Sequence, residues 1–212
     1  MRTMTSYRAT LVLALLGAGL IPARAHLSPT VVLVKKKEVL GQLLPGAETF
    51  QGRELLLSRT EIKSLSETSG LHLSREPVRF YRGEDAGGVL LGTVLFTVGD
   101  SVHGPVEVAV ALDGSGAVIG FQVTRCSAEV LPWVRTVQRT KVLEPIIGTG
   151  AGEARGPEDL PLGDLAPLTS MARFYARVIR EGIFKALALS RWIRPPDDPR
   201  SGSGLPMVNP DR

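Results

Sequence analysis

The chain has 212 residues, of which 43% are hydrophobic and 22% charged, and its formal net charge is +4. This length predicts one folded domain with tails, large enough to bury a core. Three of the 25 basic residues and none of the 21 acidic ones lie in residues 1–25, which leaves 22 basic against 21 acidic residues in the rest. Because those charges are balanced and interspersed, the composition gives no reason to expect a nucleic-acid partner.

Residues 1–25 have the pattern of a secretory signal peptide. Arg2 and Arg8 precede a short apolar run, and Ala23-Arg24-Ala25 forms a small-x-small cleavage pattern. The run is too short for a membrane span, and no cysteine lies near the cut to carry a lipid. We therefore expect an exported protein, in the periplasm or on the extracytoplasmic face of the membrane, whose mature chain begins at His26.

The chain has one cysteine, Cys126, and three histidines, His26, His72 and His103. An exported protein with one cysteine has no internal disulfide and depends on its core for stability. We expect Cys126 to be a buried apolar residue of a strand. The histidines are not at metal-motif spacing. A copper site at an N-terminal His26 would need a second histidine, and nothing in the sequence brings one to it.

Two helices are predicted before the centre of the chain. Ser28-Pro29 has the pattern of a helix start, followed by apolar residues near helical spacing over residues 30–44. Pro45-Gly46 ends this helix. Ser58 and Glu61 form a capping box, which predicts a second helix to about Ser66.

The middle of the chain is rich in β-branched and aromatic residues and predicts an antiparallel meander. A tight hairpin turn is expected at residues 113–116, D-G-S-G. Alternation on the strand before this turn places four apolar side chains on one face of the sheet: Val106, Val108, Val110 and Leu112. The four expected strands cover residues 78–82, 89–99, 106–113 and 117–125.

The last third predicts a short helix over residues 131–143, a Gly- and Pro-rich loop over 147–165, and a long helix from Thr169 to Ser190. The apolar stripe of the long helix comprises Met171, Phe174, Val178, Ile179, Ile183 and Leu187. The expected fold is α+β, an antiparallel sheet with helices before it and the long helix packed on it. The domain is expected to span residues 26–192, with a disordered tail over 193–212.

The order of these segments resembles that of exported FMN-binding domain proteins, relatives of the flavin-carrying subunits of the sodium-pumping NADH:quinone reductase and of the Rnf complex. The resemblance covers residues 28–189 and includes "LLPGA", "VRFYR", "GTVLF" and a terminal helix that opens with "LTS". Its most specific part is "HGPVEVAVALDGSGAVIGFQV", residues 103–123.

The family carries a motif of the form D-x-x-[ST]-G-A-[ST]-x-[ST] before its terminal helix, where a flavin transferase esterifies a hydroxyl with the FMN phosphate. Here Leu165, Ala166 and Pro167 stand where Gly, Ala and the modified Thr are expected. Proline has no hydroxyl, so the family's phosphoester cannot form at residue 167. A further family segment of E-T-P-G type reads "RCSAEVLPW" here, with Glu129 as its remnant.

Five residues are candidates for the FMN site that the resemblance suggests, two for the phosphate and three for the ring. Thr169 and Ser170 stand at a helix N-terminus, where they either hold a phosphate or act only as caps. His103 and Gly104 either approach the ligand or form a tight turn with an exposed imidazole. Trp133 either stacks on the flavin ring or packs against the sheet.

The resulting hypothesis is an exported flavoprotein that acts as an electron carrier or accessory subunit rather than as a stand-alone enzyme. FMN would be bound noncovalently, or attached at Thr169 by a flavin transferase. The implied partner is a redox protein or a membrane electron-transfer complex. The alternative is a flavin-free structural or assembly partner of such a complex that retains only the fold.

Overall fold

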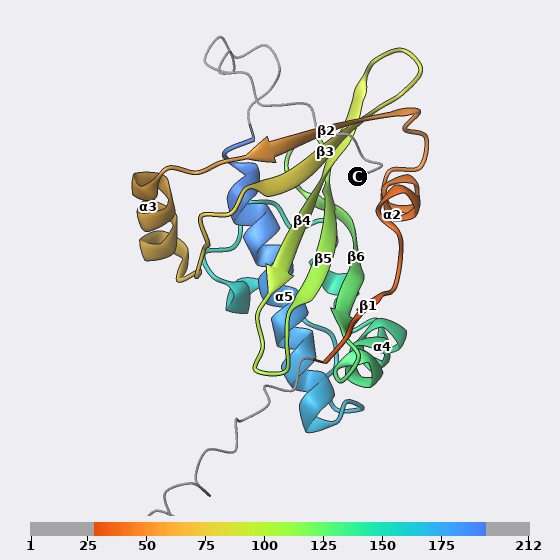
Figure 1. Cartoon of the computed structure of the whole chain (residues 1–212), viewed down its shortest axis with the longest axis vertical. Helices are drawn as coiled ribbons and strands as arrows, with labels where there is room; N and C mark the ends of the chain where they lie inside the picture. Colours follow the sequence, from red (N-terminus) through yellow and green to blue (C-terminus); the bar gives the residue numbers. More distant parts are fainter. Residues whose placement is uncertain (1–27, 194–212) are drawn as a thin grey trace, which may run out of the picture.

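The computed structural model describes residues 28–193 and has a six-stranded antiparallel sheet with helices on both faces (Figure 1). The predicted signal peptide and the predicted tail beyond Ile193 lie outside the described residues. The strand order is β1-β6-β5-β4-β3-β2. Strands β2 to β6 therefore form a meander, and β1 pairs with β6 at one edge of the sheet. The predicted α+β class is confirmed.

The helices and strands alternate only in the first part of the chain, and the last helix is the longest. In chain order, the elements are β1 (Thr30–Val32), α2 (Lys36–Leu43), β2 (Thr49–Leu55), α3 (Arg59–Ser69), β3 (Val78–Glu84), β4 (Leu90–Gly99), β5 (Val106–Leu112), β6 (Val118–Ser127), α4 (Leu131–Thr140), the 3₁₀ turns η1 (Glu144–Ile146) and η2 (Pro157–Asp159), and α5 (Ser170–Ser190).

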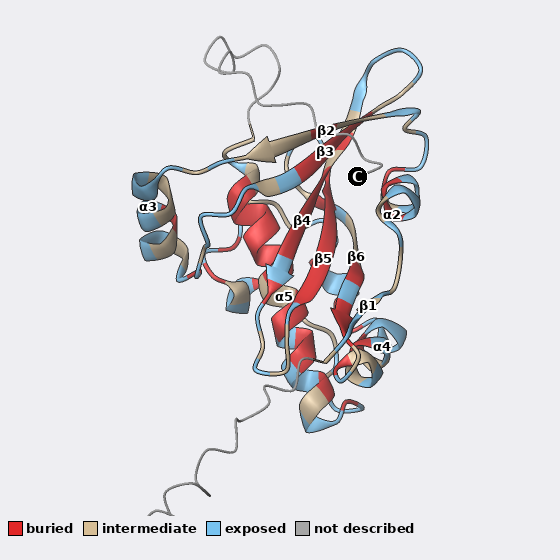
Figure 2. Ribbon diagram, viewed as in Figure 1, coloured by how far each residue is buried: buried red, intermediate tan, exposed pale blue. Residues whose placement is uncertain are grey.

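Each face of the sheet has its own apolar core, because successive side chains of a strand point to opposite sides. The larger core lies under α5 and α4, and the central strands and α5 are its most buried parts (Figure 2). The smaller core lies under α2, where Val39 and Leu40 pack against Ala109 and Ala111 of β5. The predicted face of β5 is confirmed, since its four alternating apolar residues all belong to the core under α5.

Local signals in the sequence give the expected turns and caps. Asp113 N–H donates to the carbonyl of Ala117 at 2.9 Å, and Gly116 closes the hairpin with φ +84°. The side chain of Ser58 accepts a hydrogen bond from Glu61 N–H, and the carboxylate of Glu61 accepts one from Ser58 N–H, so the capping box is present. Cys126 is buried in β6 as predicted. Burial also raises the pKa of its thiol, which disfavours the reactive thiolate.

Three expectations about secondary structure are wrong. The helix expected over residues 30–44 begins only at Lys36, because Thr30–Val32 pairs with Arg125–Ser127 as an edge strand. These residues are β-branched and suit a strand. The strand Thr49–Leu55 was not expected, because it contains polar residues and a glycine. On α5, Phe174 is 39% exposed, and the adjacent Tyr175 is buried in its place.

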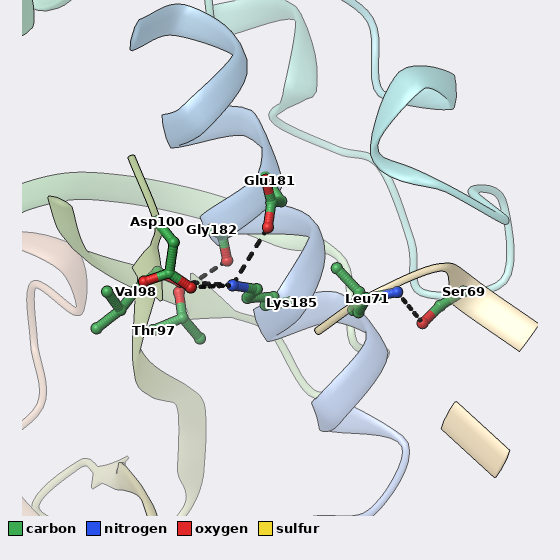
Figure 3. Close-up of polar contacts among 8 residues, drawn as sticks. All are labelled: Ser69, Leu71, Thr97, Val98, Asp100, Glu181, Gly182 and Lys185. Atoms are coloured by element: carbon green, nitrogen blue, oxygen red, sulfur yellow. Dashed lines mark hydrogen bonds and ion pairs between the residues drawn. The ribbon is translucent and has the colours of Figure 1, made fainter. Parts of the chain in front are cut away.

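Close contacts hold α5 against the sheet. A Cβ atom on Gly99 would overlap the carbonyl oxygen of Val178, so only glycine permits this approach of β4 to the helix. The hydroxyl of Thr97 donates to the carbonyl of Gly182 at 2.7 Å (Figure 3). The N-terminal part of α5 is thereby positioned beside the turn between β4 and β5.

Candidate functional site

His103 and Gly104 lie in the turn that joins β4 to β5. Gly104 has φ +110°, and its N–H donates to the carbonyl of Ser101 at 3.1 Å. Ser127 donates its hydroxyl to the carbonyl of His103 at 2.7 Å, and a Cβ on Gly104 would lie 3.2 Å from the Cβ of Ser127. The glycine therefore meets the conformational demand of a tight turn packed against the end of β6.

The imidazole of His103 is held by a carboxylate. Its Nδ1 lies 2.8 Å from Oε1 of Glu129, and the other oxygen of Glu129 accepts a hydrogen bond from Ser28 at 3.3 Å. Both side chains of the pair are partly exposed. When the imidazole is neutral, the Nδ1 proton is donated to the carboxylate, which leaves Nε2 as an acceptor directed elsewhere.

Trp133 connects this turn to α5. Its ring stacks on Tyr175 with centroids 5.5 Å apart and an interplanar angle of 3°, and it lies 6.2 Å from the His103 ring at a tilt of 48°. The hydroxyl of Tyr175 lies 3.3 Å from that of Ser101, and burial raises the pKa of the phenol. One face of the indole is therefore occupied by a side chain of the protein's own core.

Thr169 is the N-cap of α5, and its Oγ1 accepts a hydrogen bond from Ala172 N–H at 3.3 Å. Thr169 and Ser170 are both exposed. The cap leaves the N–H groups of Ser170 and Met171 without an acceptor inside the helix. Arg173 lies in the same turn, and its guanidinium donates to the carbonyls of Leu168 at 3.0 Å and Ala166 at 3.2 Å. The turn thus combines free N–H groups with a guanidinium, which favours an anion.

The structure joins three of the five predicted site residues and leaves two apart. His103, Gly104 and Trp133 form one cluster with Tyr175. Thr169 and Ser170 precede Tyr175 by six and five residues, which is about 9 and 7.5 Å along the helix axis. Thr169 and Ser170 thus lie at the start of α5, one to two turns before the residue that contacts the cluster.

Sequence reasoning missed two members of this region. Tyr175 was missed because two adjacent aromatic residues fit the helical period almost equally well. Arg173 was missed although it lies four residues after Thr169, where a side chain on the same helical face is expected.

A pocket of about 500 Å³ lies one helical turn further along the same two helices. Val137 follows Trp133 by four residues on α4, and Ile179 follows Tyr175 by four on α5. The pocket lies between α2, β6, α4 and η1, and its volume is within the range of small-molecule sites. It is lined by Gln42, Leu43, Pro45, Ile119, Gly120, Phe121, Gln122, Val123, Val137, Gln138, Lys141, Leu143, Glu144, Ile147 and Ile179.

A second pocket, of about 290 Å³, contains the buried ammonium of Lys185. The Nζ atom donates to the carbonyl of Val98 at 2.9 Å and pairs with Glu181 at 3.2 Å and Asp100 at 3.4 Å (Figure 3). The Lys185 side chain is 6% exposed. Because these three acceptors satisfy its protons, the lysine ties the end of β4 to α5 and leaves no donor for a ligand.

No protein-family model matches this chain, and no curated protein matches it significantly. Within residues 28–193, no group of three or more His, Cys, Asp or Glu side chains is placed to hold a metal ion. His26 lies outside this range. None of the helices in the described part of the chain is long and apolar enough to cross a membrane.

Proposed function

We propose that this protein binds FMN and acts in extracytoplasmic electron transfer, as a carrier or an accessory subunit for a redox protein or a membrane complex. The observation that supports this proposal is the convergence of the His103-Gly104 turn, Trp133 and the N-terminal half of α5. The helix N-terminus is where the resemblance places the FMN phosphate, and the turn and Trp133 are our candidates to line a pocket for the ring. The three come from separate parts of the chain.

The residues present fit a noncovalently held flavin nucleotide. Ser170, the free N–H groups of the first turn and the guanidinium of Arg173 offer donors to a phosphate. Each such contact contributes about 0.3–1 kcal/mol at an exposed helix end, so the ring also has to be bound. The edge of Trp133 and the imidazole of His103 are the aromatic groups that we assign to the ring. Bound FMN would supply the redox chemistry, and the chain would supply position and electrostatics.

A flavin-free assembly partner is the second candidate function. It is favoured by the internal contacts of the same residues, because Thr169 already caps α5 and Trp133 already stacks on Tyr175. The positive φ of Gly104 in its turn likewise accounts for a glycine there without a ligand. In this case the cluster would only hold the β4–β5 turn against α4 and α5.

Titration of the purified protein with FMN, monitored by quenching of flavin fluorescence, distinguishes the flavin carrier from the flavin-free assembly partner. Saturable quenching that weakens in Ser170→Ala and Thr169→Ala supports the flavin site. Ser58→Ala is the matched control, since it removes an N-cap of α3 away from the cluster. Absence of saturable binding in the wild type would reject the flavin carrier and leave the assembly partner. A mass increase of one FMN that disappears in Thr169→Ala would instead place a covalent attachment at that residue.

A further inference from the structure

Strand β6 has a stretch of outer edge without a strand partner in the described part of the chain. β1 pairs only with Arg125–Ser127, and a single bridge joins Ala117 to Gly150 at the other end. Between them, residues 120–123 pair with β5 on one side, Ile119 lies at a register shift of that pairing, and residues 119–123 line the 500 Å³ pocket. An open edge presents backbone N–H and C=O groups that an extended segment can pair with.

The groove beside this edge suits an uncharged, apolar segment. Ile119 and Ile147, which line it, are 40% and 50% exposed. The polar side chains around them are three glutamines and one ion pair, in which Lys141 Nζ lies 2.9 Å from Glu144 Oε1. The lining therefore carries no net charge and offers amide groups to a peptide backbone.

The C-terminal segment of the chain starts close to this groove. The guanidinium of Arg191 donates to the carbonyl of Ala151, and Thr149 pairs with Val118 at the start of β6. From Ala151 the loop runs back to Ile147 in the groove, a span of at most about 14 Å for four residues. Eleven residues, 194–204, separate Ile193 from the next apolar run, L-P-M-V, at 205–208. Eleven residues span at most about 36–40 Å when extended, so this length is sufficient to reach the groove.

We propose that residues 205–208 of this chain occupy the groove as an added strand along residues 119–123 of β6. All four residues of the segment are apolar, which suits the uncharged groove. With Leu205 and Met207 directed by their backbone groups toward β6, the nitrogen of Pro206 faces solvent, where proline is tolerated on an edge strand. Leu205 and Met207 then share one face and cover the exposed isoleucines. This inference is independent of flavin binding.

Hydrogen–deuterium exchange of the full chain tests the proposal. The outward-facing amides of residues 119–123 are expected to exchange about tenfold or more slowly in the wild type than in the double variant Leu205→Asp, Met207→Asp, because the pairing is lost there. Ser201→Asp, Ser203→Asp is the matched control, since it adds the same charge to the Gly/Ser stretch and should keep the protection. Ile147→Asp, which places a charge in the lining of the groove, should also remove the protection of residues 119–123.

Two results would overturn the proposal. Equal exchange of residues 119–123 in the wild type and in Leu205→Asp, Met207→Asp would mean that this segment does not cover the edge. Protection that increases with protein concentration would mean that a second copy of the chain does so. Protection that is independent of concentration and lost in both the segment variant and the groove variant supports the assignment.

Discussion

Trp133 of α4 and Tyr175 of α5 stack with nearly parallel rings, 5.5 Å between centroids. This pair joins two helices that are separated in sequence by a long loop, and it brings the β4–β5 turn to α5 through His103 and Ser101. The stack is therefore both a structural contact and the centre of the candidate site.

We expect Trp133→Ala to destabilise the domain by about 2–4 kcal/mol, since it removes a large, partly buried aromatic ring and leaves a cavity against Tyr175. Urea unfolding would measure the loss. Phe174→Ala is the control, because that ring is on α5 beside Tyr175 but is 39% exposed, and its loss should cost under about 1 kcal/mol. Equal losses in the two variants would contradict the assigned packing.

Lys185→Met is expected to lower the free energy of unfolding by about 1–2 kcal/mol. The substitution keeps the volume of the side chain but leaves the carbonyl of Val98 without its donor. Asp100 is 75% exposed and can be hydrated instead. Lys63→Met removes an exposed ion pair with Glu67 and should change stability by less than about 0.5 kcal/mol. A Lys185 variant as stable as the Lys63 variant would show that the buried bonds contribute nothing.

Gly99→Ala is expected to destabilise the protein by about 2 kcal/mol or more, because the new methyl group would overlap the carbonyl of Val178 and push α5 off the sheet. Thermal unfolding would detect the change. Gly41→Ala, inside α2, meets no atom within 4 Å of the added Cβ, and it should be neutral or stabilise by up to about 1 kcal/mol. Destabilisation by both variants alike would argue against the close approach.

The hairpin at residues 113–116 should make stability depend on acidity. Hydrogen bonds from the Ser115 hydroxyl, and from the backbone N–H groups that follow, hold the pKa of Asp113 below its ordinary value. Because the pKa of Asp113 is lower in the folded chain than in the unfolded chain, the carboxylate stabilises the folded protein at pH values above the unfolded pKa, about 3.9. This contribution disappears as the pH falls through the pKa of the folded protein.

The stability gap between the wild type and Asp113→Asn should therefore be full at neutral pH and shrink in acid, as measured by urea unfolding at several pH values. Ser115→Ala removes the main cause of the shift and should weaken this dependence. A gap that stays constant down to strongly acidic pH would contradict the role of the carboxylate.

Most of the fold could be predicted from local signals. Alternating β-branched residues, the D-G-S-G turn, the Ser58–Glu61 capping box and the Thr169 cap each specify their conformation through neighbouring atoms, so the sequence alone determined β3 to β6 and the helices α3, α4 and α5. The three β-branched residues at 30–32 were misassigned because their strand exists only through pairing with β6, about a hundred residues away. The strand β2 was missed because its sequence is largely polar, and it too forms by pairing with another segment, β3.

The candidate site shows the same division. The sequence singled out His103, Gly104 and Trp133, but only the tertiary structure decided that they meet Tyr175, one to two helical turns after Thr169 and Ser170. Periodicity could not choose between Phe174 and Tyr175, because neighbouring residues differ by only about 100° around a helix. The groove beside β6 also depends on where β1 stops pairing. Each of these features arises from contacts between segments distant in the chain, and the local sequence carries no information about such contacts.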